Sequence, residues 1–313
     1  MRADEKRQEM EIIRETLGYA HRFRSKLFVL NIDCAVIEDQ FFPILIEDIA
    51  ALQRAGIRIV LVPGTRDRLD RTLRNYSISQ EYYRGLRITT DTSLPFVEMV
   101  AFKIANDLMS ALVGADVRSI IGNWVRAKGR GIIDGVDYQH TGLVEKIDAQ
   151  ALYGILEAGA IPIFPPIGWN AAGKTYNLAA EELAYEVSVS LRADKLLFVG
   201  TPETSGTEGI KLPKTVITDS QGRLNRLTVQ EARELVKMNA QSPTDGDEAV
   251  NDVLWRLDLA RKACEMGVNR VHLVDGLQEG VVMREIFSNT GGGTMVHTSI
   301  FESIRPMLSL IHI

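Results

Sequence analysis

The chain has 313 residues, a formal net charge of −5, 45% apolar residues and 25% charged residues. This composition is ordinary for a soluble globular protein, and the absence of a basic stripe argues against a nucleic-acid or membrane surface. No apolar run approaches the roughly 20 residues of a membrane span. The two cysteines, Cys34 and Cys264, lie in apolar stretches without CxxC spacing. We therefore expect two buried, reduced thiols in a cytoplasmic protein, rather than a disulfide or a metal pair.

The first 25 residues have the pattern of an amphipathic helix. Apolar side chains recur three and four positions apart over residues 3–24, at Met10, Ile13, Leu17 and Ala20. Such a helix either packs on its own domain or forms an arm against another subunit, and the periodicity does not separate these two possibilities. We treat residues 1–25 as an N-terminal arm, which favours a homo-oligomer.

Strands and helices alternate along residues 26–306, which we take as one domain. Continuous apolar runs at 27–32 and 57–62 predict strands buried on both faces. Helical stretches follow them at about 40–55 and 67–75, and this alternation is typical of a parallel sheet with crossover helices. The glycine-punctuated stretch from Gly131 to Ile147 predicts a small hairpin layer.

Candidate binding residues follow the predicted strands, because ligands of open α/β sheets bind at the carboxyl ends of the strands. Gly64 permits close backbone approach, Arg66 and Arg87 can grip a carboxylate, and Asn177 can donate and accept at the head of a helix. Arg87 is expected in a loop, Gly85 to Thr89. These residues predict a pocket for a small acidic molecule. The alternative is that both arginines form ordinary surface salt bridges.

No metal site is expected, because the five histidines are far apart in the sequence and show no paired ligand spacing. Motifs for a Walker loop, a dinucleotide fold or a nucleophile elbow are also absent from the sequence. The strand-end loops are therefore the only candidates for chemistry.

Eight segments, in order, resemble the amino-acid kinase fold: VLNIDCAVI, IVLVPGTR, YRGLRITTD, GVDYQHTGLVEKID, AGAIPIFPPIG, TYNLAAEELA, GVNRVHLVDG and EIFSNTGGGTMV. Within it the chain is most similar to the N-terminal domain of glutamate N-acetyltransferases, also called N-acetylglutamate synthases, over about residues 17–305. The resemblance implies a three-layer α-β-α sandwich around a mainly parallel sheet, of the amino-acid kinase and carbamate kinase type. It also implies a regulatory domain in arginine biosynthesis with L-arginine as its effector.

The resemblance also shows what a kinase would need. The sibling acetylglutamate kinases carry Lys-x-Gly-Gly at the first strand end, where this chain reads Asn31-Ile32-Asp33-Cys34. A second kinase lysine corresponds to Trp255 or Arg256, and the kinase's acidic residue falls on Glu181. Phosphoryl transfer depends on positive charge and positioning, so we expect none. The alternative is an acetylglutamate kinase that phosphorylates N-acetyl-L-glutamate with ATP through a rearranged phosphate site.

Two sets of site residues result from the resemblance. The kinase-like pocket would bind L-glutamate or N-acetylglutamate, or be an inherited relic; it comprises Gly64, Arg66, Arg87, Asn177 and Glu181. The regulatory arginine site would comprise Tyr19, Glu285, Gly291 and Gly293. Relatives that respond to arginine carry a histidine a few residues before that glutamate, where this chain has Gly280, and usually read GIGT rather than GGGT. The alternative is a glycine turn that only joins a helix to an edge strand.

In the resembling family a separate domain binds acetyl-CoA and transfers the acetyl group. We expect that catalytic domain to be missing here, so that the chain holds no cofactor, and we regard residues 307–313, MLSLIHI, as a non-native or truncated tail. A third hypothesis is a stand-alone scaffold subunit that partners a separate acetyltransferase chain.

Overall fold

Residues 18, 22–202, 209–213, 216, 218, 224–239, 248–287 and 292–298 are described in the computed structural model of the chain. Most of the expected N-terminal arm and the whole of the expected tail at 307–313 lie outside these residues. None of the helices that the structure describes is long and apolar enough to cross a membrane.

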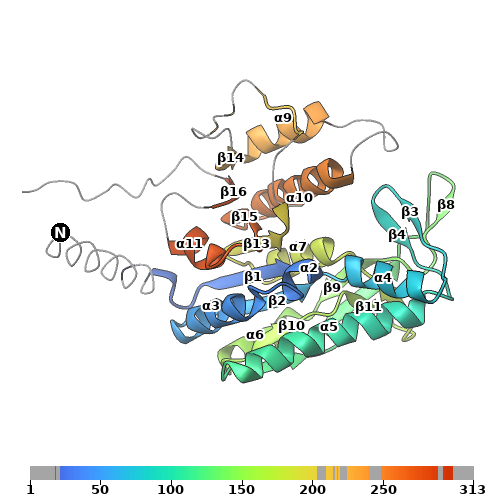
Figure 1. Ribbon diagram of the computed structural model, residues 1–313, viewed down its shortest axis with the longest axis horizontal. Helices are drawn as coiled ribbons and strands as arrows, with labels where there is room; N and C mark the ends of the chain where they lie inside the picture. Colours follow the sequence, from blue (N-terminus) through green and yellow to red (C-terminus); the bar gives the residue numbers. More distant parts are fainter. Residues whose placement is uncertain are drawn as a thin grey trace, which may run out of the picture.

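An eight-stranded sheet forms the centre of the molecule (Figure 1). Its order from one edge to the other is β14 (Arg226–Thr228), β16 (Thr294–His297), β15 (Arg270–Asp275), β13 (Lys195–Gly200), β1 (Leu27–Ile32), β2 (Arg58–Pro63), β10 (Ile161–Ile163) and β5 (Ser119–Ile121). The pairs from β15 through β5 are parallel, whereas β16 runs antiparallel to β15 and β14 runs parallel to β16. The mainly parallel sheet is confirmed.

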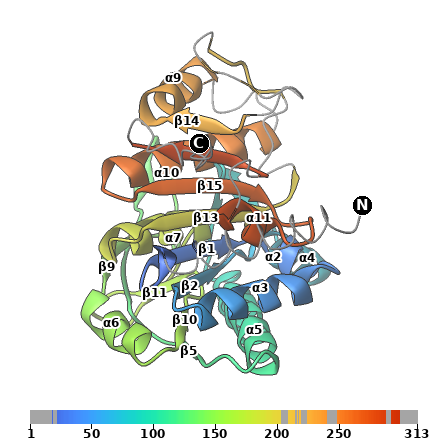
Figure 2. The same ribbon diagram turned by 90° about the vertical axis from the view of Figure 1, so that its left-hand side faces the viewer.

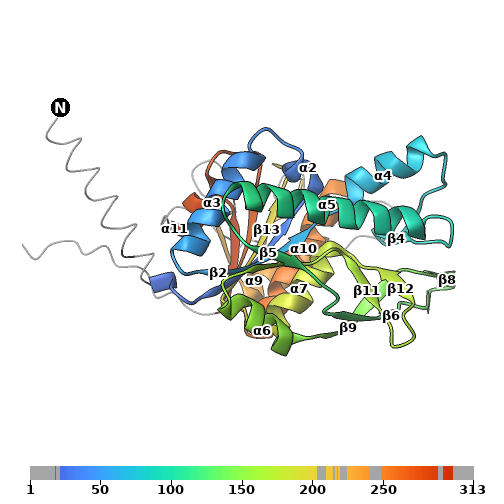
Figure 3. The same ribbon diagram turned by 90° about the horizontal axis from the view of Figure 1, so that it is seen from below.

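Helices cover both faces of this sheet, so the fold has three layers (Figures 2 and 3). One face packs against α2 (Cys34–Ile37), α3 (Phe42–Arg54), α4 (Arg66–Asn75), α5 (Leu94–Gly114) and α11 (Val281–Phe287). The other packs against α6 (Ala149–Glu157), α7 (Ala180–Ser190), α9 (Val229–Asn239) and α10 (Glu248–Glu265). The expected α-β-α sandwich is confirmed.

The alternation of side chains along β1 explains the two apolar cores. Phe28, Leu30 and Ile32 point into the core beneath α3 and α5, whereas Leu27 and Val29 point into the core beneath α7 and α10. A strand buried on both faces must be apolar throughout, which is why LFVLNI was recognisable as a strand. Asn31 alternates with these residues so that it shares the sheet face of Leu27 and Val29, the face covered by α10.

A smaller, polar layer stands at the carboxyl ends of the strands. It is a four-stranded sheet in the order β12 (Thr175–Asn177), β11 (Ile167–Trp169), β6 (Val125–Gly129) and β9 (Gly142–Ile147). Two hairpins extend from it, β3 (Glu81–Tyr83) with β4 (Leu86–Ile88), and β7 (Ile132–Ile133) with β8 (Val136–Asp137). The hairpins lie side by side (Figure 1), because the Tyr138 hydroxyl donates to the Tyr83 carbonyl and Arg84 pairs with Asp134. The expected hairpin layer is confirmed.

One local expectation was wrong. Residues 85–89 are not a loop after a sheet strand, since Arg87 lies within β4 of a hairpin. Gly85 forms the turn of that hairpin with a φ of 75°, a conformation that favours glycine. The strand is three residues long and carries a charged residue at its centre, so its apolar pattern is too short to recognise.

Candidate functional site

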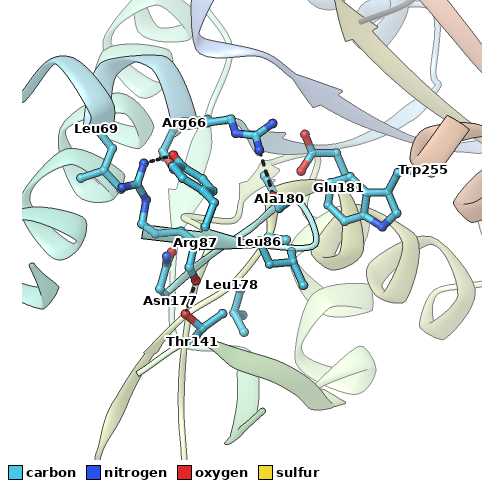
Figure 4. A pocket seen from close by; sticks show the side chains of 14 residues that line it. Arg66, Leu69, Leu86, Arg87, Thr141, Asn177, Leu178, Ala180, Glu181 and Trp255 are labelled. Carbon is cyan, nitrogen blue, oxygen red and sulfur yellow. Dashed lines mark hydrogen bonds between the residues drawn. The ribbon is translucent and has the colours of Figure 1, made fainter. Parts of the chain in front are cut away.

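A small cavity of about 80 Å³ opens where β2, the β3–β4 hairpin, β12 and the first turns of α4 and α7 meet (Figure 4). Its walls include Arg66, Arg87, Asn177 and Glu181, so the structure brings together these separate parts of the sequence. Gly64 is not part of the wall, although its neighbour Thr65 is. Gly64 instead packs against Asp33, since an added Cβ would lie 3.2 Å from the Asp33 Cα.

Arg66 spans the mouth of this cavity and already has two partners. Its Nη1 donates to Oδ2 of Asp252 on α10 at 2.7 Å, and its Nη2 donates to the carbonyl of Gly85 at 2.9 Å. Burial opposes its charge, but the carboxylates of Asp252 and Glu181 outweigh that cost and raise the pKa of Arg66. Arg66 therefore bridges α10 and the β3–β4 hairpin.

Arg87 lies beneath Arg66 and is also fully engaged. It donates to Asp70 and to the Tyr82 hydroxyl, and to Gln80 Oε1 at 3.3 Å. Its guanidinium stacks 4.6 Å from the centre of the Tyr82 ring. Burial, together with the charge of Arg66, lowers the pKa of Arg87 to about 10. The two arginines therefore line the cavity and also form ion pairs with carboxylates of their own chain.

The floor of the cavity is a chain of buried hydrogen bonds. Asn177 donates from Nδ2 to the Thr89 hydroxyl at 2.9 Å, and the Thr141 hydroxyl accepts from the Thr89 amide at 3.1 Å. Thr141 in turn donates to the Arg87 carbonyl (Figure 4). Thr141 was not identified as a site residue from the sequence, although it lies within the GVDYQHTG segment.

A buried ionic cluster joins α10 to the end of β1 and the start of α7. Nη2 of Arg256, on α10, donates to both carboxylate oxygens of Asp33 at 2.8 and 2.9 Å, and to Oε1 of Glu181 at 3.1 Å. Arg256 is 3% exposed and Asp33 8%. Burial raises the pKa of Glu181 against the opposing effect of Arg256. The Arg256 guanidinium is therefore already engaged by two carboxyl groups of its own chain.

A second buried network joins α11 to the glycine turn before β16. Glu285 Oε2 accepts from the amides of Gly292 and Gly293 at 2.7 and 3.1 Å. Glu285 Oε1 lies 2.6 Å from Nδ1 of His272, whose Nε2 lies 3.3 Å from the Lys195 ammonium. Because lysine can only donate, His272 accepts at Nε2 and donates from Nδ1. Tyr19 and Gly291, the other expected members of this site, lie outside the described residues.

Burial and charge set the protonation of this network. Burial, with the charge of Lys195, lowers the pKa of His272 to about 4, so the imidazole is neutral at pH 7. Burial also lowers the pKa of Lys195 to about 8. For Glu285, burial is outweighed by the donors from His272, Gly292 and Gly293, which lower the pKa to about 2. Glu285 is thus a buried carboxylate anion with oriented donors.

His272 and Lys195 were not identified as site residues from the sequence. His272 contacts Glu285 from β15, on the strand face that meets α11, whereas the segment just before Glu285 has Gly280 and no histidine. Lys195 comes from the neighbouring strand, β13, in register with Arg270. The sequence offered one signal for His272, namely a single polar residue within the otherwise apolar strand VHLV. Within the described ranges, no group of His, Cys, Asp or Glu side chains could hold a metal ion.

Comparison with known proteins places this geometry in a family. The model of the amino acid kinase family matches residues 32–275. The chain belongs to the amino acid kinase family. A carbamate kinase from Giardia lamblia shares this fold with a TM-score of 0.59 at 11% identity, over 88% of this chain and 99% of that one.

More similar members of the amino acid kinase family are longer proteins. An amino-acid acetyltransferase of Vibrio cholerae is 31% identical over 302 residues, which cover 93% of this chain and 65% of the relative. The N-acetylglutamate synthase of Neisseria gonorrhoeae, solved with coenzyme A and N-acetylglutamate, is 31% identical with a TM-score of 0.78, over 93% of this chain and 64% of that one. The same synthase has been solved with coenzyme A and L-arginine. The chain thus spans about two thirds of these relatives' length.

Proposed function

We propose that this chain is the kinase-derived, L-arginine-sensing domain of a glutamate N-acetyltransferase, and that it transfers no phosphate itself. The observation that carries the proposal is the contact of Arg256 with both oxygens of Asp33. A phosphoryl group needs free positive charge and amide donors. Here the Arg256 cation is already paired with Asp33 and hydrogen-bonded to Glu181, so it is not free to hold a phosphoryl group.

The Glu285 network supports the sensing part. A carboxylate has about four acceptor positions, and three donors from His272, Gly292 and Gly293 engage Glu285. Counting only partners among the described residues, one acceptor position is left, and we propose that a guanidinium takes it. The rigid donors fix the carboxylate in place, which lowers the entropy lost when a ligand binds. The gonorrhoeal synthase, solved with L-arginine, is the relative that suggests the ligand.

Acetyl transfer from acetyl-CoA to L-glutamate is assigned to the part of the relatives that this chain does not span. In that arrangement L-arginine acts as the effector of the complete protein. The Arg66 pocket would at most bind L-glutamate or N-acetylglutamate without reacting.

Calorimetric titration of the purified chain with L-arginine tests the sensing role. We expect saturable binding of L-arginine and at least tenfold weaker binding of L-citrulline, which has the same shape without the positive charge. Glu285→Gln should also weaken L-arginine binding at least tenfold. The matched control is Glu279→Gln, since Glu279 is exposed in the preceding loop, and its affinity should equal that of the wild type.

Absence of L-arginine binding by the folded wild-type chain would contradict the sensing role. The kinase alternative has its own assay, in which ATP and N-acetyl-L-glutamate are incubated with the chain and acetylglutamyl phosphate is trapped with hydroxylamine. We expect none, and ATP-dependent product above a no-enzyme control would restore the acetylglutamate kinase hypothesis.

A further inference from the structure

The first described turns of α10 face the Arg66 pocket with three different side chains. Asp252 pairs with Arg66, Trp255 lines the cavity wall, and Arg256 holds Asp33 and Glu181. Asp252 and Arg256 are four positions apart and therefore lie on one face of the helix. This face contacts the loops after β1 and β2, as well as the start of α7. One helix thus contributes both a carboxylate and a guanidinium to the inherited site.

Asp252 gives Arg66 the carboxylate contact that an acidic ligand would otherwise make. A guanidinium on a cavity wall recognises a carboxylate through short N–H···O bonds. The Arg66 Nη1 to Asp252 Oδ2 contact of 2.7 Å has that geometry, and the carboxylate comes from the same chain, 186 positions away. The Asp252 side chain is 19% exposed and that of Arg66 32%. The pair is therefore close enough to solvent for an entering ligand to compete.

The charges around the pocket also oppose an added anion. The guanidinium groups of Arg66, Arg87 and Arg256 are each already paired with a carboxylate, that of Asp252, Asp70 and Asp33 respectively. An added dicarboxylate would therefore find these positive charges already neutralised. The cavity of about 80 Å³ is also well below the roughly 300 Å³ at which pockets for drug-sized ligands begin.

We propose that α10 is an internal latch on this pocket, in which Asp252 occupies Arg66 as a built-in carboxylate and a ligand carboxylate binds only by displacing it. Arg66 keeps its second contact, with the Gly85 carbonyl, when Asp252 leaves. The hairpin then remains in place, and the first turns of α10 are the part that moves. The proposal concerns the Arg66 pocket alone and does not depend on the binding of L-arginine at Glu285.

The test removes the charge of Asp252 and measures binding of N-acetyl-L-glutamate, the probe dicarboxylate, to the full chain. Asp252→Asn retains the shape of the side chain but frees the Arg66 charge. We expect the variant to bind the probe at least tenfold more tightly than the wild type in calorimetric titration. Asp252→Glu, which retains a carboxylate, should not gain affinity. Asp258→Asn is the matched control, because Asp258 lies on the same helix but pairs with Arg261 and Lys262 outside the pocket.

A second arm shows whether the gain acts through Arg66. In the double variant Arg66→Met/Asp252→Asn the gain in affinity should disappear, although the cavity is no smaller. In the wild-type chain at saturating probe, hydrogen exchange should be faster in residues 252–256 than without the probe, with unchanged exchange in residues 81–88.

Three outcomes would overturn the latch. One is a folded Asp252→Asn variant that binds the probe no better than the wild type. Another is equal improvement in Asp252→Asn and Asp258→Asn, and the third is a gain that survives loss of Arg66. If circular dichroism shows that Asp252→Asn is unfolded, Asp252→Ser is used in the same comparison and judged by the same outcomes.

Discussion

Nη2 of Arg256 on α10 contacts both carboxylate oxygens of Asp33, at the end of β1, at 2.8 and 2.9 Å. The two residues are 223 positions apart, and both are buried. This contact joins the two halves of the sequence, because it links the end of β1 to α10. Among the residues that the structure describes, two other Arg256 nitrogens, Nε and Nη1, are buried without a hydrogen-bond partner. The cluster is therefore held together by charge and is sensitive to the loss of any member.

Replacing Arg256 with methionine should destabilise the fold by roughly 3–5 kcal/mol, because breaking a buried ion pair leaves carboxylates buried without a counter-charge. Urea unfolding followed by circular dichroism measures the change. The double variant Asp33→Asn/Arg256→Met should recover part of the loss, since one of the stranded charges is gone.

The control for this prediction is Lys262→Met on the same helix. Lys262 pairs with Asp258 at the surface and its side chain is 47% exposed, so the cost should stay below about 1 kcal/mol. Equal costs for Arg256→Met and Lys262→Met would show that the buried cluster contributes no more than a surface pair.

The large sheet could be predicted because its central strands are buried on both faces. LFVLNI and its parallel neighbours must be apolar at every position, which leaves a signal in the sequence that is independent of context. The β3–β4 hairpin leaves no such signal. EYY and LRI are three residues long and mostly exposed or half-buried, so tertiary contacts rather than an apolar pattern decide that they pair.

Four residues of the cavity wall, Arg66, Arg87, Asn177 and Glu181, could be named from the sequence, whereas Thr141 and the partners of the arginines could not. Arg66 follows a recognisable strand, whereas Asp252 reaches it from 186 positions later. Ion pairs between residues so distant have no periodicity, and any acidic residue on the helix was an equal candidate. His272 was likewise hidden within a strand, where a single polar residue does not reveal that it faces Glu285.

Gly293→Ala should destabilise the protein by about 1–3 kcal/mol through overpacking. An added Cβ at Gly293 would lie 2.1 Å from the Leu273 carbonyl oxygen, so β15 or the turn must shift. That shift would also disturb the Gly293 amide that donates to Glu285. Thermal unfolding measures the loss, and calorimetry should show weaker L-arginine binding.

Gly292→Ala is the matched control, because its added Cβ meets only the Val281 side chain, at 3.7 Å. Its amide also donates to Glu285, and alanine retains that amide. We expect a change in stability below about 0.5 kcal/mol. Similar losses at the two glycines would mean that the close approach to Leu273 is not what fixes this turn.

The His272–Glu285 pair should make stability fall in acid. The pKa of His272 is lowered from 6.5 to about 4 in the fold, so the unfolded chain binds the proton more readily and stability declines from pH 6.5 to pH 4. The pKa of Glu285 is lowered to about 2, so its contribution is lost from about pH 4.5 downwards. The His272 part is on the order of 3 kcal/mol, from a pKa difference of about 2.5 at about 1.36 kcal/mol per unit.

Urea unfolding at a series of pH values between 7 and 4 measures this decline. His272→Asn has no group that titrates at this position, so its stability should fall less steeply between pH 6.5 and 4, even though it starts lower. Parallel curves for the wild type and the variant would assign the acid sensitivity to other groups.

The two thiols should be unreactive in the native protein. Cys34 and Cys264 are free and buried, as expected from the sequence, and burial raises the pKa of each to about 12. Because the thiolate is the reactive form, labelling at pH 8 requires an opening of the structure.

Cys264 also donates to the carbonyl of Val296 on β16, at 3.5 Å, and β16 begins directly after the glycine turn. L-Arginine should therefore slow the labelling of Cys264 more than that of Cys34. Single-cysteine variants, Cys34→Ala and Cys264→Ala, treated with a chromogenic disulfide, measure each rate separately. Rapid labelling of Cys264 without denaturant would contradict its burial, and equal slowing of both thiols would show that the ligand stabilises the whole domain rather than the β16 edge.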